Sequence, residues 1–294
     1  MTRVAFIGLG NMGSGMAANV QKAGREVAAF DLSADAMKHA REAGMSAAAS
    51  AGEAVKGADV VITMLPAGQH VRQVYADEVA PNAKAGALLI DCSTIDVESA
   101  RSVAAQMEAK GFRFADAPVS GGTAAAQGGA LTFMVGCRDA DFAAVEEALT
   151  PMAKAVIHAG GAGAGQAAKI CNNMLLGISM IGTCEAFALA EKLGLDPVRF
   201  FDISSKSSGQ CWSMTAYCPW PGPVPAAPSN RGFEGGFAAA MMLKDLRLAQ
   251  EAAQASGAET PLGAHAREFY EAFVAAGHAG KDFSAVIEQL RGKL

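Results

Sequence analysis

The segment Gly8-Leu9-Gly10-Asn11-Met12-Gly13 fits the pattern G-x-G-x-x-G, and its surroundings give that pattern a structural meaning. The apolar run Val4–Ile7 precedes it and predicts a buried strand. The stretch Asn11–Lys22 follows it with the pattern of a helix. A glycine turn between a strand and a helix directs free backbone N–H groups of the helix toward a bound phosphate. The segment therefore predicts the first strand, turn and helix of a dinucleotide-binding fold.

Asp31 supports this interpretation, because it ends the next apolar run, Val27–Phe30, about 20 residues beyond the turn. A carboxylate at this place accepts hydrogen bonds from the adenosine ribose hydroxyls and repels a 2′-phosphate. The next residues, Leu32 and Ser33, include no arginine, so we expect NAD rather than NADP. The alternative is that the glycines only make a turn and that Asp31 caps the next helix. The cofactor-binding residues expected here are Gly8, Gly10, Asn11, Met12, Gly13 and Asp31.

Apolar runs continue to alternate with helical stretches through residues 1–162. This alternation predicts a parallel sheet with helices on both faces, and right-handed crossovers then make it a doubly wound, Rossmann-type sheet. The expected strands are Val60–Met64, Ala87–Ile90, Arg113–Asp116 and Leu131–Val135, and the expected helices include Ser33–Ala43 and Gln69–Val79. Leu65, Pro66 and Thr94 follow strands and are expected to line the cofactor site. Ser93 and Thr94 could equally be N-caps of the helix after them.

Strand patterns nearly vanish after the glycine-rich segment Gly160–Gly165. Residues 163–294 therefore predict a second, all-α domain for substrate binding and oligomerisation. The stretch Ala167–Leu193 is long and apolar on most sides, so we expect it to be buried between domains or between subunits. Further helices are expected at Phe237–Ala255, Leu262–Ala276 and Phe283–Leu290, with a loop at Pro219–Pro225.

The composition narrows the function classes. The 294 residues are 51% hydrophobic and 18% charged, which is typical of a globular protein, and the net charge of −5 argues against a nucleic-acid partner. The six cysteines form no Cys-x-x-Cys pair, so we expect reduced thiols and no metal site. No apolar run approaches the about 20 residues of a membrane helix, and the N-terminus lacks a leader pattern. We therefore expect a cytoplasmic protein without a membrane partner.

Two further segments carry candidate chemistry. In Asp116–Thr123, the turn Ser120-Gly121-Gly122 exposes successive N–H groups that can hold a carboxylate, although it could also be a plain turn. In Gly163–Asn173, Lys169 and Asn173 are four residues apart and share one helical face. A lysine in an apolar helix is usually a snorkelling surface residue. Here it follows a glycine-rich domain junction beside paired asparagines, as a residue of an active site would.

With these segments the chain resembles the β-hydroxyacid dehydrogenases over nearly its whole length, and within them the branch that acts on 3-hydroxyisobutyrate. The glycine turn, Asp116–Thr123 and Gly163–Asn173 match motifs of the family, as does Lys244-Asp245-Leu246. The segments Ser207–Ser213 and Lys281–Ser284 are more specific to that branch, although Gln210 stands where close relatives are expected to have arginine.

The resemblance implies roles for individual residues. Lys169 corresponds to the family's catalytic lysine, and Asn173 to a residue that orients the substrate. Ser120, Gly121 and Gly122 would hold the substrate carboxylate, and Lys244 would lie near the nicotinamide. His70 corresponds to a small polar residue near the cofactor. Trp212, with Phe237, is our guess for an apolar wall of the substrate pocket, although a core role suits either aromatic better.

The function implied is NAD-dependent oxidation of (S)-3-hydroxyisobutyrate to methylmalonate semialdehyde, a step of valine breakdown, by a homodimer or homotetramer. Lys169 would act as general base, and oxidation would then become faster at alkaline pH. A related short-chain enzyme, such as a tartronate semialdehyde reductase or a serine or 3-hydroxypropionate dehydrogenase, needs only a repacked pocket. A 6-phosphogluconate dehydrogenase is disfavoured, since no phosphate site is evident. A non-catalytic NAD-binding module would need neither Lys169 nor Asn173. A helical interaction or scaffold protein is a third alternative, and the long helix does not discriminate, since it could also serve dimer formation in an enzyme.

Overall fold

The computed structural model describes residues 2–294, and the chain forms two compact units. Unit 1 ends at Lys169 and unit 2 begins at Ile170. The division falls inside one long helix, α9 (Ala164–Lys192), whose first residues belong to unit 1 and whose remainder belongs to unit 2. The boundary predicted at 162/163 lies just before this helix.

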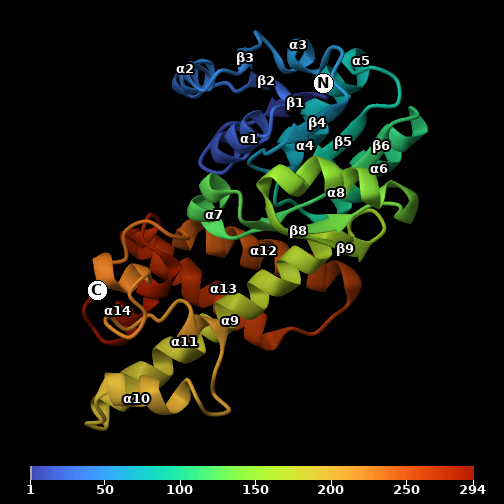
Figure 1. The fold of residues 1–294 in the computed structure, drawn as a ribbon. Coiled ribbons are helices and arrows are strands. Elements are labelled where there is room, and N and C mark those ends of the chain that lie inside the picture. The colour runs from blue at the N-terminus through green and yellow to red at the C-terminus, as the bar shows by residue number, and fades with distance from the viewer. Residues whose placement is uncertain (1) are drawn as a thin grey trace. The chain divides into compact units, whose positions relative to one another are not determined.

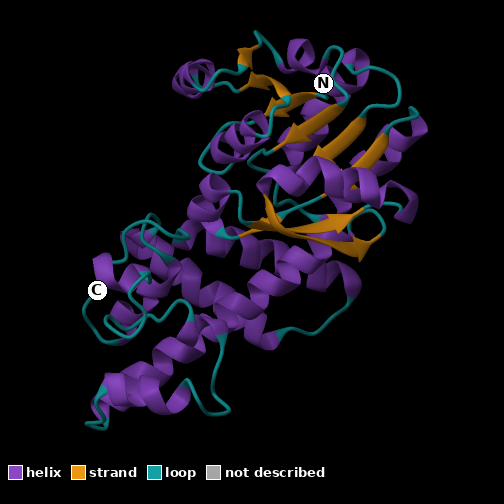
Figure 2. Cartoon of the chain, in the orientation of Figure 1, coloured by secondary structure: helices purple, strands orange, loops and turns teal. Residues whose placement is uncertain are grey.

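Unit 1 is built on a nine-stranded sheet with the order β3-β2-β1-β4-β5-β6-β8-β7, and β9 pairs with β8 (Figures 1 and 2). The pairs from β3 through β6 are all parallel, which is the arrangement that the strand–helix alternation predicted. β8 differs, because it runs antiparallel to both β6 and β7. The strands are β1 (Arg3–Ile7), β2 (Glu26–Phe30), β3 (Ser46–Ala47), β4 (Val60–Thr63), β5 (Leu88–Asp91), β6 (Arg113–Asp116), β7 (Val119–Ser120), β8 (Leu131–Gly136) and β9 (Ala153–Gly160).

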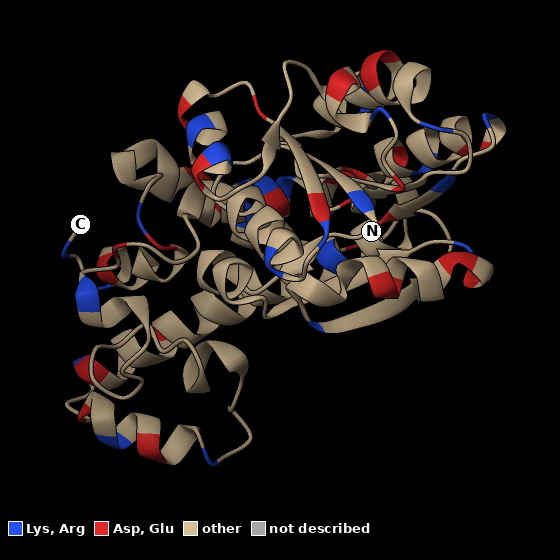
Figure 3. Cartoon of the chain, turned by 45° about the horizontal axis from the view of Figure 1, so that its top comes forward, with Lys and Arg blue, Asp and Glu red and all other residues tan. Residues whose placement is uncertain are grey.

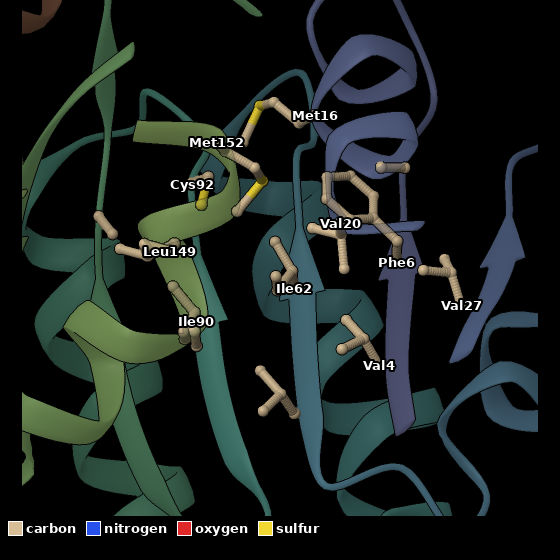
Figure 4. Packing of buried hydrophobic residues seen from close by; sticks show 14 of the residues in the cluster. Val4, Phe6, Met16, Val20, Val27, Ile62, Ile90, Cys92, Leu149 and Met152 are labelled. Atoms are coloured by element: carbon tan, nitrogen blue, oxygen red, sulfur yellow. The ribbon is translucent and has the colours of Figure 1, made fainter. Parts of the chain in front are cut away.

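Helices cover both faces of this sheet because side chains alternate between the faces along each strand. In β1, Val4 and Phe6 join one buried cluster, whereas Ala5 and Ile7 join another. Figure 4 shows the first cluster, in which Met16 and Val20 of α1 pack beside Phe6. Its helices are α1 (Gly13–Lys22), α2 (Ala34–Glu42), α7 (Gly122–Gly128) and α8 (Phe142–Leu149); the second face carries α3 (Ala51–Val55), α4 (Gly68–Val74) and α6 (Val97–Ala109). A π-helix, Tyr75–Val79, and the short α5 (Ala80–Asn82) follow α4.

Unit 2 consists of helices around its own buried cluster, which includes Phe187, Tyr270 and Phe283. The stretch 219–225 contains no helix or strand, as its prolines predicted. The helix expected at Leu262–Ala276 divides into an α-helix and a π-helical turn, and the one expected at Phe283–Leu290 begins as a 3-10 turn. After α9, the helices are α10 (Pro197–Ser204), α11 (Trp212–Thr215), α12 (Ala239–Ser256), α13 (Pro261–Phe273) and α14 (Val286–Leu290).

Helix α9, which we expect to be buried between domains or between subunits, carries exposed apolar side chains in the single chain. Leu175 and Leu189 are 64% and 59% exposed. By length and composition the helix could cross a membrane, with a mean hydropathy of 1.4, although the core helix of a soluble protein passes the same test. Lys169 and Glu185 lie within this helix, so its apolar residues form no uninterrupted run of about 20. Elsewhere, Figure 3 shows charged residues of both signs interspersed over the helices.

Candidate active site

The glycine turn after β1 has the geometry that a pyrophosphate cradle needs. Gly8 has φ +95°, and a Cβ there would lie 2.2 Å from the carbonyl oxygen of Met64. A Cβ on Gly13 would lie 2.0 Å from the Gly8 carbonyl oxygen, so α1 closes directly onto the turn. Gly10 is exposed, and nothing lies within 4 Å of the position its Cβ would take. No side chain of residues 2–294 caps the N-terminus of α1. This combination leaves room and backbone N–H groups for a phosphate.

Asp31 holds this turn to the end of β2. Its carboxylate accepts hydrogen bonds from the backbone N–H of Leu9 (2.6 Å) and of Ser33 (2.8 Å). The capping side chain of α2 is Ser33, whose Oγ accepts from the Ala36 N–H, so the alternative role of Asp31 as that cap is wrong. A carboxylate has about four acceptor sites, and two remain for ribose hydroxyls. The glycine turn and Asp31 together therefore fit an NAD molecule.

The ends of β4 and β5 meet beside the turn. The N–H of Leu65 donates to Ser93 Oγ (2.7 Å), and that hydroxyl donates to Asp91 (2.6 Å). Helix α6 is capped by Asp96, which accepts from the Ser99 N–H (2.7 Å), so neither Ser93 nor Thr94 is the N-cap considered above. The hydroxyl of Ser93 instead ties two strand ends together.

Three other residues were expected near the cofactor, namely Pro66, His70 and Lys244. Pro66 follows Leu65 and is exposed. His70 lies in α4 and is half-buried, and its Nδ1 is buried with no hydrogen-bond partner in the described chain. Lys244 lies in α12 of unit 2.

The segment Ser120-Gly121-Gly122 joins β7 to α7, as an anion-holding turn would. Gly121 and Gly122 have φ values of +139° and +69°, and both are exposed. Two successive glycines with positive φ turn consecutive N–H groups outward at the N-terminus of a helix. The backbone therefore suits a carboxylate at this place.

Lys169 is 7% exposed, so it is not the snorkelling surface lysine of the usual alternative. Asn173 lies one turn further along α9 and is 2% exposed. In unit 2, Asn173 Nδ2 donates to Asp245 Oδ2, and Asn172 Nδ2 donates to Asn173 Oδ1 (3.0 Å). These bonds fix the Asn173 amide, and Lys169 and Asn173 share one face of the helix.

Trp212 and Phe237, which we expect to form an apolar wall of the substrate pocket, each contact another aromatic ring in unit 2. Trp212 begins α11, is 52% exposed, and stacks on Tyr217 with ring centroids 4.9 Å apart. Phe237 is half-buried and meets Phe283 edge-on at 5.7 Å. The exposed Gln210 donates to Thr215 Oγ1 (3.1 Å). An exposed tryptophan held by a tyrosine is not a core residue, so its ring is available to a ligand.

Sequence reasoning assigned no role to four buried polar residues near these positions: Asp91, Asp116, Gln166 and Asp245. Asp91 and Asp116 end the adjacent parallel strands β5 and β6. Burial raises the pKa of Asp116 to about 6. Hydrogen bonds from the N–H groups of Gly163 and Gln166 to its carboxylate act in the opposite direction and lower the pKa. The sequence contained one signal for a shared role of Asp91 and Asp116: each of them ends a predicted strand. The ends of neighbouring parallel strands meet at one edge of a sheet.

The described residues offer no obvious metal centre. Within residues 2–294, no group of three or more His, Cys, Asp or Glu side chains is placed to hold a metal ion.

Both halves of the chain match known families. Residues 3–161 match the model described as the NAD binding domain of 6-phosphogluconate dehydrogenase. Residues 163–290 match the one described as "NAD-binding of NADP-dependent 3-hydroxyisobutyrate dehydrogenase".

Several known proteins are similar over their whole length. A 3-hydroxyisobutyrate dehydrogenase of Pseudomonas aeruginosa is 50% identical over 297 residues, covering 100% of each chain. An NAD-dependent L-serine dehydrogenase of the same organism is 48% identical and covers 97% of each. A structure of Mycobacterium tuberculosis 3-hydroxyisobutyrate dehydrogenase with L-serine aligns with a TM-score of 0.96 at 50% identity, covering 99% of both chains.

The matching families, the full-length identity and the NAD-binding geometry agree with one another. The chain belongs to the 3-hydroxyisobutyrate dehydrogenase family and is an NAD-dependent oxidoreductase that acts on a hydroxy acid.

Proposed function

We propose that the chain oxidises (S)-3-hydroxyisobutyrate to methylmalonate semialdehyde, with Lys169 as the general base and Asn173 as the residue that orients the substrate. The observation that carries this proposal is the burial of Lys169 on the helical face that it shares with Asn173, whose amide is fixed by Asp245. A buried lysine costs desolvation free energy, and a helix that needed only packing would use an apolar residue there.

The residues divide the work of the reaction. The N–H groups of Ser120–Gly122 would hold the substrate carboxylate, and the Asn173 amide would position the hydroxyl. Nζ of Lys169 takes the hydroxyl proton as the carbon–oxygen double bond forms, and it returns a proton in the reverse reaction. Bound NAD would supply the acceptor for the hydride that leaves the same carbon.

We propose NAD rather than NADP as the working cofactor. Asp31 carries a negative charge where an adenosine 2′-phosphate would lie, and the next residues, Leu32 and Ser33, offer no cation to it. The two hydrogen bonds from Leu9 and Ser33 keep the Asp31 carboxylate in place.

L-serine is the second candidate substrate. One relative at 48% identity is named an NAD-dependent L-serine dehydrogenase, and the similar structure from Mycobacterium tuberculosis is that of a dehydrogenase with L-serine. Serine and 3-hydroxyisobutyrate share the hydroxymethyl group and the carboxylate, and they differ at the 2-substituent. That substituent is a methyl group in 3-hydroxyisobutyrate and a charged ammonium group in L-serine, and an apolar pocket disfavours an ammonium group that is buried without a partner.

The first experiment measures initial NADH formation with (S)-3-hydroxyisobutyrate, L-serine, D-glycerate and 6-phosphogluconate, each with NAD and with NADP. We expect the highest kcat/KM with 3-hydroxyisobutyrate and NAD, and a rate that rises toward alkaline pH. Lys169→Ala should lower kcat by about 10²–10⁴-fold while NAD still binds. Lys192→Ala is the matched control, because Lys192 ends the same helix and lies far along it from Lys169.

The outcomes separate the parts of the proposal. A higher kcat/KM with L-serine would replace the substrate and keep the roles of the residues. Turnover of 6-phosphogluconate alone would contradict the substrate class. Full activity of Lys169→Ala would remove Lys169 from the reaction.

We further propose that the protein works as a homodimer or homotetramer in the cytoplasm, in valine breakdown. Apolar side chains on unit 2 support an assembly: Leu189, Leu193 and Ile203 are 59%, 76% and 58% exposed. Sedimentation velocity should give a dimer or tetramer, and Leu193→Glu should shift it toward monomer. Cell fractionation and growth on valine after gene deletion test the other two points.

A further inference from the structure

The first turn of α9 is held by two buried polar side chains, Asp116 and Gln166. Asp116, at the end of β6, accepts the N–H groups of Gly163 (2.6 Å) and Gln166 (2.9 Å). It thus acts on α9 as a capping side chain does, although it lies 47 residues before Gly163 in the chain. Its charge also faces the positive end of the helix dipole.

Gln166 uses both ends of its amide. Its Nε2 donates to the carbonyl oxygen of Ser93 (2.7 Å), and its Oε1 accepts from the N–H of Ile95 (3.1 Å). Thr94 lies between these two backbone groups. The amide therefore clamps the loop after β5 to the first turn of α9.

The hydrogen bonds of this clamp extend to the ends of β4 and β5. Ser93 Oγ donates to Asp91, and Thr63 Oγ1 at the end of β4 donates to the same carboxylate oxygen (2.7 Å). Thr63, Asp91, Ser93 and Asp116 are all fully buried, as is Gln166. Low dielectric strengthens such a chain of hydrogen bonds and makes a broken one costly.

Packing alone does not account for a glutamine at this place. Ordering its side chain costs about 1.5–2 kcal/mol of conformational entropy, and burying its amide costs more. An apolar side chain of the same volume would fill the space without the cost of burying an amide. What the amide adds is a fixed relation between two short segments, the loop Ser93–Ile95 and the helix turn that carries Lys169 three residues later.

We infer that Gln166 and Asp116 are positioning residues for the reaction, which together hold Lys169 at a fixed position relative to the loop that contains Thr94. The inference rests on the proposed role of Lys169. Neither residue takes part in proton transfer. Both act by fixing the position of the Lys169 side chain. A displacement of about 1 Å at such a group can cost about 10²-fold in rate.

The test compares Gln166→Met with the parent and with Gln106→Met. Methionine keeps the volume of glutamine and removes both hydrogen bonds. Gln106 lies in α6 of the same unit, where its exposed amide donates to Ser102 Oγ (3.0 Å), so it is a matched surface control. The hydroxy acid is whichever member of the substrate panel the parent turns over fastest.

We expect Gln166→Met to lower kcat on the order of 10²-fold, with KM for NAD changed only a few-fold. The deuterium isotope effect on kcat, with substrate labelled at the hydroxyl-bearing carbon, should rise because the chemical step becomes slower than product release. The double variant Gln166→Met/Lys169→Ala should be no slower than Lys169→Ala alone, since Gln166 acts through Lys169. Gln106→Met should match the parent.

Hydrogen exchange of the cofactor-free protein gives a readout independent of turnover. Amide exchange in the first turn of α9 should accelerate in Gln166→Met and stay at the parent rate in Gln106→Met. If Gln166→Met shows no cooperative melting transition, Gln166→Leu replaces it. Leucine also removes both hydrogen bonds and buries no charge, so the same fall in kcat is expected.

The outcomes are distinguishable. A parent-like kcat and isotope effect in Gln166→Met, with Lys169→Ala inactive, overturn the inference and leave the proposed function intact. Losses that multiply in the double variant also overturn it, because they indicate a general structural role. Full activity of Lys169→Ala overturns the proposed function and this inference with it.

Discussion

At the scale of single residues, Asp116 couples the N-terminus of α9 to pH. Desolvation raises the pKa of its carboxyl from 3.8 to about 6, and the negative charge of Asp91 adds to this. Between these two pH values the folded protein holds a proton that the unfolded chain has released. The contribution of Asp116 to the free energy of unfolding therefore increases as the pH falls through this window, and it is lowest above pH 6.

We predict that urea unfolding will show this trend as a difference between the parent and Asp116→Asn. The shift of about two pH units corresponds to about 3 kcal/mol at most. From pH 7 to pH 4.5, the parent should gain stability relative to the variant, whose amide does not titrate. Parallel pH dependences in the two proteins would show that Asp116 titrates normally.

At the scale of elements, α9 begins where its backbone passes very close to the sheet. A Cβ on Gly165 would lie 2.3 Å from the Met134 carbonyl oxygen in β8 and 2.8 Å from that of Asp116 in β6. Neither neighbour is the end of a flexible side chain. Gly182 lies in the same helix with nothing within 4 Å of its Cβ position. A methyl group added at Gly165 would therefore clash with the sheet, whereas one added at Gly182 would not.

Gly165→Ala should lower the free energy of unfolding by about 2–3 kcal/mol, because strands β6 and β8 cannot yield without breaking their pairing. Gly182→Ala should raise it by about 0.5–1 kcal/mol, because alanine loses less backbone entropy in a helix. Thermal and urea unfolding of both variants measure the pair. Equal effects of the two substitutions would mean that α9 can shift away from the sheet at no cost.

At the scale of the whole molecule, the six cysteines report on each unit separately. All six are free thiols. Cys92 and Cys137 are buried in unit 1, Cys184 and Cys218 are buried in unit 2, and Cys171 is exposed. Each buried pair therefore becomes accessible only when the core of its own unit opens.

We predict that a thiol reagent will modify Cys171 at once in the native protein, with the buried four reacting only on unfolding. The midpoint of urea unfolding should be the same with and without a reductant, because no disulfide constrains the unfolded chain. Mass spectrometry of the labelled peptides identifies each site. Rapid labelling of Cys92 or Cys184 in the native state would contradict the burial of that core.

The sequence by itself determined the parts of this protein that depend on local pattern. The glycine turn, Asp31 and the alternation of apolar runs predicted the parallel strands β1, β2, β4, β5 and β6, because period and turn chemistry are local properties. Short elements were missed, among them β3 and α3, and so was the longer β9. β3 has two residues and α3 has five, and the alternating burial of β9 is imperfect, so none gives a clear period.

Only the tertiary structure decided which polar residues work together. Asp116 is 47 residues from Gly163 in the chain, Gln166 is 73 from Ser93, and Asn173 is 72 from Asp245, yet each pair is hydrogen-bonded. No periodicity links residues so far apart. Their partnership follows from the parallel sheet, which brings the ends of distant strands to one edge, and from the burial that forces each polar group to find a partner.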